Sequence, residues 1–453
     1  MISVVNPANG KMVKQLPTDS DATIQDKINK CRSAQQTWIL TPIAERKKIV
    51  AHFADLLVQH AQDCAEATSE ETGRPVHQVK NEIMATKPRI DVFIDKVESV
   101  MASRPAYKDD QVEEIITWDP LGVVANISAW NYPYFVGSNV FIPALLTGNG
   151  VLYKPSEFAA MTGLKLAELW AQTDLPDGLF ATVMGAGDVG QTLLEQDIDG
   201  VFFTGSHATG QKINQFVAPK LIKVGFELGG KDPAYVSEDV DVATVAPGVA
   251  DGAFYNCGQS CCAVERVYVH EAIYDDFVEA FVKAVEGFVV GDPKDDTTYL
   301  GPLTRAAQIK AIDEQVADAV KKGAVLRLGG NAMEGDGNFY EPTVLTDVNH
   351  NMKVMQEESF GPIIGIHKVS SDQEAVQLMN DTVYGLTASV FCRDTKRSRS
   401  LMYHLNAGTV YSNCCDRVSP YTPWSGRGHS GLGSTLSEIG IETFLQPKAW
   451  HIK

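Results

Sequence analysis

A cluster of cysteines is the first feature of the sequence that suggests chemistry. The stretch YNCGQSCCAVER, residues 255–266, places Cys261 next to Cys262, with Cys257 one turn upstream. Gly258 would let a substrate or cofactor approach the backbone closely. A cysteine acts as a nucleophile when its thiol is partly ionised and reachable, and the neighbouring thiols are equally well explained as small packing residues. The stretch is therefore a candidate nucleophile site.

Metal binding and a disulfide are weaker explanations of this cluster. A zinc site uses paired Cys or His ligands at short spacing, and Cys257 and Cys261 have no convincing second pair in the chain. A disulfide between the adjacent Cys261 and Cys262 would be strained. We predict no metal site, and free thiols for the eight cysteines of this long chain.

Two further side chains could complete a reaction at a cysteine. FELGGKDP places Glu227 among apolar residues and before two glycines, and a carboxylate in such surroundings has a raised pKa and can act as a general base. SAWNYP places Asn131 in an aromatic loop after a strand, where a buried amide can donate to an oxyanion. The alternatives are a solvated glutamate at a strand edge and a structural asparagine.

Two strand ends carry residues suited to a nucleotide. VLYKPSE places Lys154 and Glu157 where they could bind a ribose or a phosphate. GVFFTGSHATG places Gly205 and Ser206 at a turn from a strand into a helix, whose free N–H groups favour anions. Neither motif is a GxGxxG fingerprint, and each alone also fits a loop that binds nothing.

The elements that must position these residues alternate along the chain. Residues 20–101 are predicted to be helical. One helical stretch within them runs over 44–73 and stops at Gly73. After them, short apolar runs predict strands at 122–128, 150–155, 179–185, 200–206 and 221–230. Helical stretches at 136–148, 161–173 and 207–218 separate them. This alternation predicts a parallel sheet with helices on both faces, which binds nucleotides at the carboxyl ends of its strands.

A second α/β domain is predicted from about residue 230 to 430. Its helical stretches are 272–288, 306–323 and 372–382. Residues 111–120 and the C-terminal ETFLQPKAWHIK predict strands outside the main sheets, and such strands often pair with another subunit.

Composition restricts the partners of the chain. Its 453 residues carry a formal net charge of -18, which argues against nucleic acid or an anionic membrane as a partner. The N-terminal MISVVNPANGKMVKQL lacks the pattern of a signal peptide, and the most apolar region is broken by Asn, Pro, Thr and Gly. We therefore expect no membrane association and a cytoplasmic protein.

Taken together, these motifs resemble those of the NAD(P)-dependent aldehyde dehydrogenase superfamily. The resemblance runs from NPANGK at residue 6 to the C-terminal strand. The motifs follow in the order PLGVVANISAWNYP, GNGVLYKPSE, FFTGSHATG, FELGGKDP, NCGQSCCAVER, EESFGP and NDTVYGLTASVF. The resemblance implies a Rossmann-like parallel-sheet cofactor domain (1–102 and 120–229), an α/β catalytic domain (230–433) and a small β oligomerisation element (103–119 and 434–453).

The resemblance also implies roles for individual residues. Cys261 would be the nucleophile, Glu227 the general base, and the Asn131 amide with the Cys261 N–H the oxyanion hole. The implied cofactor residues are Lys154, Ser156 and Glu157 for the adenosine part, Gly205 and Ser206 at the pyrophosphate, Glu358 and Phe360 beside the nicotinamide, and Trp130. The implied reaction is attack of the thiolate on an aldehyde, hydride transfer, and hydrolysis of the resulting thioester. Glu227 argues against the branch of the family that forms acyl-CoA.

Substrate and cofactor preference are less determined by the sequence. Tyr132, Tyr134, Tyr255 and Trp424 would give an aromatic tunnel for an apolar or cationic aldehyde, whereas Arg417 could bind the carboxylate of a semialdehyde. The segment PWSGRGHSGLG, residues 423–433, departs from the family pattern, with Gly428 in place of a lysine. Glu157 would crowd a 2′-phosphate, which favours NAD, although NADP is possible.

Two other classes of function are compatible with parts of this pattern, and the quaternary state is open. A non-catalytic, crystallin-like use of the fold is opposed by the presence of Cys261, Glu227 and Asn131. A cofactor-independent cysteine hydrolase would have no need of the two ribose-binding glutamates. The two outlying strands predict a homodimer or a homotetramer.

Overall fold

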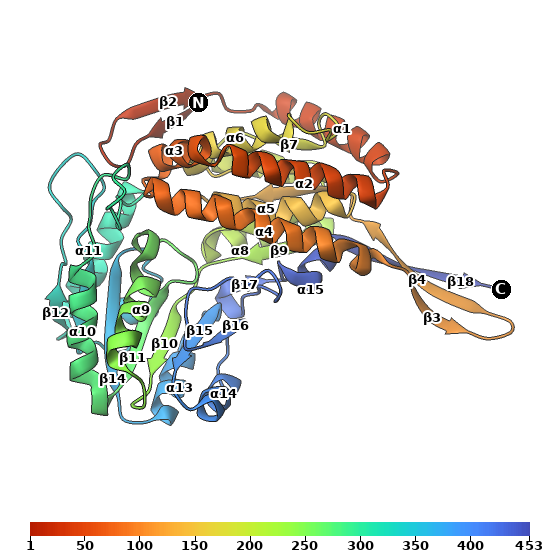
Figure 1. The fold of residues 1–453 in the computed structure, drawn as a ribbon. Coiled ribbons are helices and arrows are strands. Elements are labelled where there is room, and N and C mark those ends of the chain that lie inside the picture. Colours follow the sequence, from red (N-terminus) through yellow and green to blue (C-terminus); the bar gives the residue numbers. More distant parts are fainter.

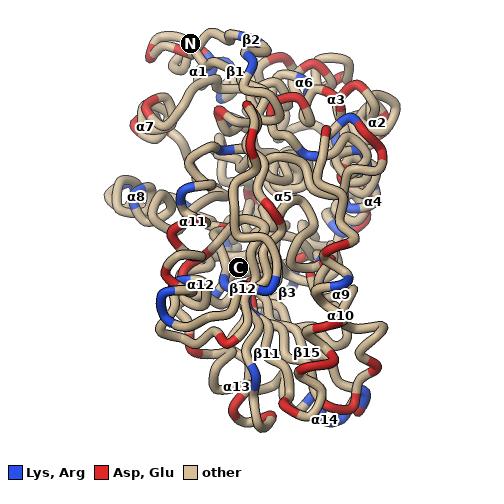
Figure 2. Tube along the Cα trace, turned by 90° about the vertical axis from the view of Figure 1, so that its left-hand side faces the viewer, with Lys and Arg blue, Asp and Glu red and all other residues tan.

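The computed structural model describes residues 1–453, which form two large sheets, two small sheets and the helices that cover them (Figure 1). No helix is both long and apolar enough to cross a membrane. On the face shown in Figure 2, Lys and Arg residues are interspersed with Asp and Glu rather than gathered in one basic area.

The first large sheet has the strand order β17-β9-β8-β5-β6-β7. Its strands are β5 (Val123–Ile127), β6 (Gly150–Lys154), β7 (Phe180–Thr182), β8 (Gly200–Thr204), β9 (Lys223–Glu227) and β17 (Gly431–Leu432). The first five strands are parallel and correspond to the five strands predicted from the sequence. Strand β17 is antiparallel to β9, so a segment that we assigned to the second domain completes the first sheet.

Helices cover both faces of this sheet because alternate strand residues point to opposite sides. Val124 of β5 belongs to a core formed with α2 (Ile43–Gln59), α3 (Ala61–Thr72), α4 (Val76–Met101), α5 (Pro133–Leu146) and α6 (Ala160–Trp170). Val123 and Ala125 belong to a second core formed with α1 (Asp21–Trp38), α7 (Gly187–Glu195) and α8 (His207–Val217). The predicted helix-covered parallel sheet is therefore present.

The helix ends follow from local chemistry. A capping box starts α1, in which the Ser20 side chain accepts from the Thr23 N–H and the Thr23 hydroxyl accepts from the Ser20 N–H. Gly73 ends α3 in the left-handed conformation with φ 80°, as its position in the sequence predicted. The stretch 44–73, which we expected to be one helical stretch, is divided at His60 because this residue leaves helical geometry, with φ −97° and ψ 17°.

The second large sheet has the order β12-β13-β14-β11-β10-β15-β16. Its strands are β10 (Asp232–Val236), β11 (Val264–His270), β12 (Val325–Leu328), β13 (Thr343–Thr346), β14 (Ile363–Val369), β15 (Thr387–Phe391) and β16 (Thr409–Ser412). All neighbours are parallel except β12 and β13. The helices of this part are α9 (Val242–Phe254), α10 (Tyr274–Glu286), α11 (Ala306–Lys321), α12 (Lys353–Gln356), α13 (Asp372–Asn380) and α14 (Thr395–Tyr403), followed by α15 (Ser437–Glu442).

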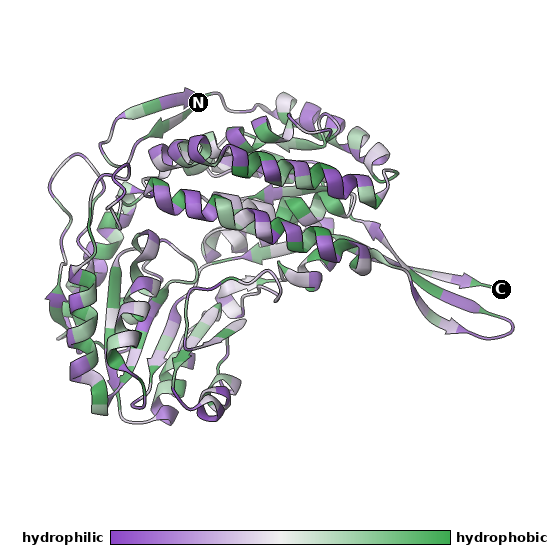
Figure 3. Cartoon of the chain, viewed as in Figure 1, coloured by the Kyte–Doolittle hydropathy of each residue, from purple (hydrophilic) through white to green (hydrophobic).

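Two small sheets complete the fold. Strands β1 (Ile2–Val5) and β2 (Met12–Leu16) form an N-terminal hairpin. Strands β3 (Arg104–Lys108), β4 (Glu113–Pro120) and β18 (Leu445–Ile452) form an antiparallel arm that projects from the body and ends near the C-terminus (Figure 1). Figure 3 shows hydrophobic and hydrophilic residues mixed along these strands, and Tyr107, Trp450 and Ile452 are exposed on them.

Candidate active site

An unusual backbone path forms the cysteine loop. After α9 ends at Phe254, Asn256 and Cys257 have left-handed dihedrals, with φ 55° and 56°, and Gly258 continues at φ +67°. A Cβ on Gly258 would lie 2.3 Å from the Gly361 carbonyl oxygen, so this position requires glycine. We expected a substrate or cofactor to approach this glycine, whereas the structure places the chain's own backbone at Gly361 against it.

The three cysteines of this loop have different environments. Cys257 is buried, its Sγ donates to the Gly301 carbonyl at 3.0 Å, and burial raises its pKa to about 12. Cys262 is also buried and donates to Asp416 Oδ1 at 3.0 Å. A hydrogen bond with Cys261, burial and the Asp416 charge hold the pKa of Cys262 well above its usual range. Only Cys261 is partly exposed, so it is the thiol of this loop that a ligand can reach.

Asn131 lies directly against the cysteine loop. It follows β5, precedes α5 and is buried. Its Nδ2 donates to the Gln259 carbonyl at 3.0 Å, and Asn256 Nδ2 donates to the Asn131 carbonyl at 3.3 Å. These bonds fix a side-chain amide beside the segment that carries Cys261.

Glu227 ends β9 with one carboxylate oxygen free. Its Oε1 accepts a hydrogen bond from the Thr435 hydroxyl at 3.1 Å, whereas its Oε2 is buried and has no partner. Burial of the carboxyl group raises its pKa to about 8. A group with this pKa can accept a proton near neutral pH, which agrees with the raised pKa that its apolar neighbours predicted.

Gly229 and Gly230 bring three parts of the site into contact. A Cβ on Gly229 would lie 2.1 Å from Glu358 Oε1, and one on Gly230 would lie 2.6 Å from the Cys261 carbonyl oxygen. The Gly230 N–H also donates to Glu358 Oε1 at 3.1 Å. The two glycines therefore let the Glu358 carboxylate and the cysteine loop meet directly after the strand that carries Glu227.

The buried carboxylate of Glu265 holds the loop around Glu358. Glu265 pairs with Lys231 Nζ at 2.7 Å and accepts from the N–H groups of Ser359 and Phe360 at 2.8 and 2.9 Å. Burial, followed by the Glu265 charge, raises the pKa of Glu358 to about 8. The Phe360 ring packs edge-on to Trp130, with 5.6 Å between ring centroids.

The predicted nucleotide residues lie at the carboxyl ends of β6 and β8. Lys154 is buried, donates to the Pro155 carbonyl at 3.3 Å, and has its pKa lowered by burial. The Ser156 hydroxyl accepts from the Phe158 N–H at 3.2 Å beside a half-buried Glu157. Gly205 leads into Ser206, an exposed side chain at the N-terminus of α8.

These positions fit a nicotinamide dinucleotide. The α7 N-terminus leaves room for a phosphate, because a Cβ on Gly187 would meet no atom within 4 Å. Glu157 and Glu358 place carboxylates where ribose hydroxyls could bind.

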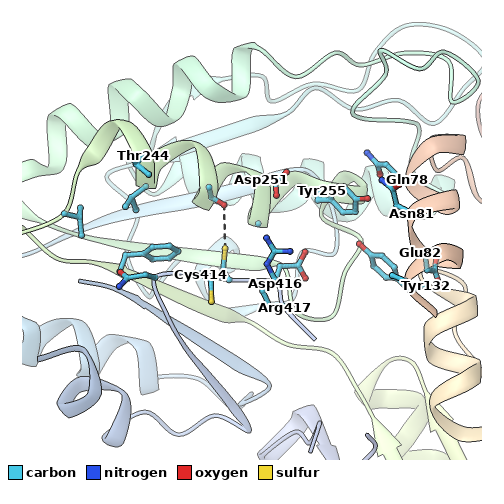
Figure 4. Close-up of a pocket in the computed structure, with 18 of the residues that line it drawn as sticks. Gln78, Asn81, Glu82, Tyr132, Thr244, Asp251, Tyr255, Cys414, Asp416 and Arg417 are labelled. Atoms are coloured by element: carbon cyan, nitrogen blue, oxygen red, sulfur yellow. Dashed lines mark hydrogen bonds between the residues drawn. The ribbon is translucent and has the colours of Figure 1, made fainter. Parts of the chain in front are cut away.

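A cavity of about 750 Å³ lies between α4, α5, α9 and the segment after β16 (Figure 4). Tyr132, Tyr255 and Arg417, which we assigned to the substrate from the sequence, line it. Several residues that line it were not predicted from the sequence, namely Arg74, Glu82, Phe135, Asp251, Cys414 and Asp416. Phe135 could have been found from its spacing, because it follows Tyr132 by three positions across the first turn of α5.

Tyr134 and Trp424 do not line this cavity, so their assignment to its wall is corrected. The Tyr134 ring is buried and its hydroxyl donates to the Cys64 carbonyl at 3.1 Å, because the first turn of α5 directs it into the helical core. Trp424 is buried in the same core, and its backbone pairs with Thr435, the residue that holds Glu227.

The segment 423–433, which departs from the expected pattern, has its own geometry. Gly428 has φ +58°, and a Cβ there would lie 2.5 Å from the Val383 carbonyl oxygen. The neighbouring His429 stacks on His207 at the start of α8, with 3.8 Å between ring centroids. A side chain at position 428 is therefore incompatible with the path that the chain follows here.

Comparison with known proteins identifies the family of this chain. The model of the aldehyde dehydrogenase family matches residues 1–450. A betaine aldehyde dehydrogenase of Mesorhizobium japonicum is 33% identical over 462 residues, covering 100% of this chain and 94% of the relative. A succinate-semialdehyde dehydrogenase [NADP(+)] of Deinococcus radiodurans is 32% identical over 447 residues, covering 98% and 94%. The crystal structure of an E. coli NADP dependent enzyme superimposes with a TM-score of 0.97 at 32% identity, covering 100% of this chain and 94% of that one.

The chain belongs to the aldehyde dehydrogenase family. It is an NAD(P)-dependent enzyme that oxidises an aldehyde to the carboxylic acid.

Proposed function

We propose that Cys261 is the nucleophile of this oxidation, that the Asn131 amide and the Cys261 N–H stabilise the oxyanion, and that Glu227 is the general base. The observation that carries the proposal is the contrast within the cysteine loop. Cys257 and Cys262 are buried and donate to fixed acceptors, whereas Cys261 is partly exposed beside the Asn131 amide.

The proposed reaction begins at the thiolate. Cys261 Sγ attacks the aldehyde carbon, and the carbonyl oxygen becomes an oxyanion that accepts from the Asn131 amide and the Cys261 N–H. The bound NAD(P)+ would supply the hydride acceptor, and loss of hydride from this carbon leaves a thioester on Cys261. Glu227 Oε2 takes a proton from water, the hydroxide attacks the thioester, and the acid leaves with regeneration of the thiolate.

The cofactor contacts follow from the strand ends. Lys154, Ser156 and Glu157 would hold the adenosine part, Gly205 and Ser206 would hold the pyrophosphate, and Glu358 and Phe360 would hold the nicotinamide part, with Trp130 packed against Phe360. Glu157 favours NAD, because its carboxylate would repel a 2′-phosphate, and NADP is the alternative. The comparison of catalytic efficiency with NAD and NADP tests this preference.

We propose a semialdehyde as the substrate class, with Arg417 as its carboxylate partner. Arg417 lines the cavity, is exposed and forms no ion pair, so its guanidinium is available. Tyr132 and Tyr255 supply aromatic walls for the carbon chain. Relatives include both betaine aldehyde and succinate-semialdehyde dehydrogenases, so the choice depends on Arg417 rather than on likeness.

We also propose a homodimer or a homotetramer in the cytoplasm. The arm formed by β3, β4 and β18 leaves the exposed edge of β3 and the exposed side chains of Tyr107, Trp450 and Ile452 available to a second copy. Light scattering of the purified protein, compared with a variant shortened after residue 444, tests the arm.

The experiment that tests the proposed function follows NAD(P)H absorbance at 340 nm with aliphatic, aromatic, amino- and carboxy-substituted aldehydes. The wild type should reduce the cofactor, and Cys261→Ala should not, while binding NAD with unchanged affinity. Retained reduction of NAD(P) by the Cys261→Ala variant would contradict the proposal that Cys261 is the nucleophile. Turnover of activated esters without any reduction of cofactor would favour the cysteine hydrolase, and neither activity would favour a structural role.

A further inference from the structure

A buried ion pair lies beside the proposed oxyanion donor without touching the cysteine. Arg74 follows the Gly73 cap of α3, and Glu82 lies in α4. Their side chains are 0% and 1% exposed, and Arg74 Nη1 donates to Glu82 Oε2. The same Nη1 atom donates to the Asn131 carbonyl at 3.0 Å. One guanidinium nitrogen therefore joins a buried carboxylate to the backbone of the residue whose amide faces the cysteine loop.

Glu82 holds the other end of the same loop. Its Oε1 accepts from the N–H groups of Tyr134 and Phe135, both at 2.9 Å. These groups belong to the first turn of α5, where backbone N–H groups have no partner within the helix. The N-cap residue, Tyr132, provides no side-chain cap. A carboxylate from another helix therefore takes the place of the missing N-cap.

The pair has no substitute among the neighbouring groups. The Arg74 guanidinium stacks on the Tyr132 ring, with 4.3 Å from its carbon to the ring centroid. Its Nε and Nη2 atoms are buried and make no hydrogen bond. Glu82 is the only carboxylate in ion-pair contact with Arg74, so loss of either member leaves the other charge buried and uncompensated.

Asn131 is also tied to the cysteine loop from the opposite side. Asn256 Nδ2 donates to the Asn131 carbonyl at 3.3 Å and to the Gln259 carbonyl at 3.2 Å, and the latter carbonyl accepts from Asn131 Nδ2 at 3.0 Å. The Asn131 carbonyl thus lies between Arg74 on the helical side and Asn256 on the cysteine side.

We propose that Arg74 and Glu82 are positioning residues for catalysis, which clamp residues 131–135 so that the Asn131 amide meets the oxyanion. The inference rests on the proposed function of Asn131. Oxyanion donors act only within about 2.7–3.1 Å of the oxygen, and a shift of about 1 Å can cost about a hundredfold in rate. The clamp acts through Asn131 alone, so its contribution disappears when the Asn131 amide is absent.

The main variant is Glu82→Gln, which keeps the shape of the side chain. A glutamine cannot satisfy all three donors, because its NH2 group must face either Arg74 or the N–H groups of α5. The expected result is a loss of about 10- to 100-fold in the rate of acylation of Cys261. Asn131→Ala is expected to lose about 100- to 1000-fold. The double variant Glu82→Gln/Asn131→Ala is expected to be within about twofold of Asn131→Ala, because the two changes remove one interaction.

Acylation of Cys261 is measured by two assays, one of which needs the cofactor and one of which does not. Stopped-flow absorbance follows the single-turnover burst of NAD(P)H from an aldehyde, and separately the burst of 4-nitrophenolate from 4-nitrophenyl acetate, whose cleavage also passes through an oxyanion but needs no cofactor. A wild type that releases nitrophenolate but never reduces NAD(P) would contradict the proposed function. The nitrophenolate bursts of the variants would still test whether Arg74 and Glu82 position Asn131.

A matched control is Asp199→Asn. Asp199 Oδ2 accepts from Arg32 Nη1 at 2.9 Å and from the Val123 N–H at 2.7 Å, the same two kinds of donor, at the opposite ends of the strands from Asn131. It is expected to lower the melting temperature without changing the acylation rate. If Glu82→Gln does not give folded protein, Arg74→Lys carries the same test, because its shorter side chain cannot place one donor at both the carboxylate and the Asn131 carbonyl.

The result that overturns the proposal is additivity. If the clamp variant loses as much rate in the Asn131→Ala background as in the wild type, the pair acts elsewhere. An unchanged acylation rate in folded Glu82→Gln, or an equal loss in Asp199→Asn, would also overturn it.

Discussion

The raised pKa of Glu227 predicts a specific dependence of the reaction on pH. Its Oε2 is buried without a hydrogen bond, and burial raises its pKa to about 8. Burial disfavours the ionised form, so the carboxyl is largely protonated below this value and becomes a base only as the pH rises through it. Hydrolysis of the thioester should therefore accelerate with pH, whereas the hydride step, which does not use Glu227, should not follow this titration.

The size of the effect follows from the titration. With a pKa of about 8, the carboxylate fraction is roughly 10% at pH 7 and roughly 90% at pH 9. The rate of thioester hydrolysis should rise about tenfold over this range. Rapid-quench mass spectrometry follows the decay of the acylated enzyme after one turnover, so hydrolysis is seen even if another step limits kcat. Stopped-flow fluorescence of NAD(P)H measures the earlier hydride step in the same samples.

The variant Glu227→Gln separates the two steps. It should keep a burst of one reduced cofactor per active site and then turn over about 10²- to 10⁴-fold more slowly, because it has lost its general base. Thr435→Val, which removes the only hydrogen bond to the Glu227 carboxylate, should shift the pH midpoint upward. The reasoning is refuted if hydrolysis is independent of pH from 6.5 to 9, or if Glu227→Gln slows the burst as much as the steady state.

Three further predictions concern the loop and the cavity. Gly258→Ala should destabilise the protein by at least about 2 kcal/mol in urea unfolding, because it combines a left-handed φ with a clash against Gly361. Gly248→Ala should not destabilise it, because an added Cβ there meets nothing within 4 Å. Equal losses of stability in the two variants would contradict the strain at Gly258. Arg417→Ala should raise KM about tenfold or more for carboxylated aldehydes only, and an equal rise for neutral aldehydes would exclude an ionic contact. Cys262→Ala should retain more than about a third of the wild-type kcat, because this thiol is buried, and complete loss would show that the wrong cysteine was assigned.

Most of the fold could be predicted from the sequence because its strands and helices have distinct local patterns. Strands β5 and β6 and residues 200–203 of β8 are buried on both faces in the structure, and such apolar runs are typical of central parallel strands. The Ser20 capping box specifies the start of α1 and Gly73 specifies the end of α3 through local interactions. Local patterns of this kind do not depend on distant parts of the chain.

The remaining features depend on contacts that a pattern does not contain. Strand β17 joins the first sheet through the pairing of Gly431 with Glu227, and nearly the whole second α/β domain lies between these two residues in the sequence. Tyr132 and Tyr134 differ only by their direction on the first turn of α5, and one lines the cavity while the other enters the core. The Arg74–Glu82 pair joins two helices to the active-site loop, and neither residue has a distinctive neighbourhood in the sequence.

The central claim is that the substrate is oxidised while attached to Cys261. The most direct test mixes Glu227→Gln with an aldehyde and NAD(P)+, quenches the mixture in acid after the burst, and maps the acyl group by peptide mass spectrometry. The account predicts one acyl group on Cys261 in the peptide that contains residues 255–266, in proportion to the reduced cofactor. Reduced cofactor without any acylated cysteine, or an acyl group on Cys262 instead, would contradict it.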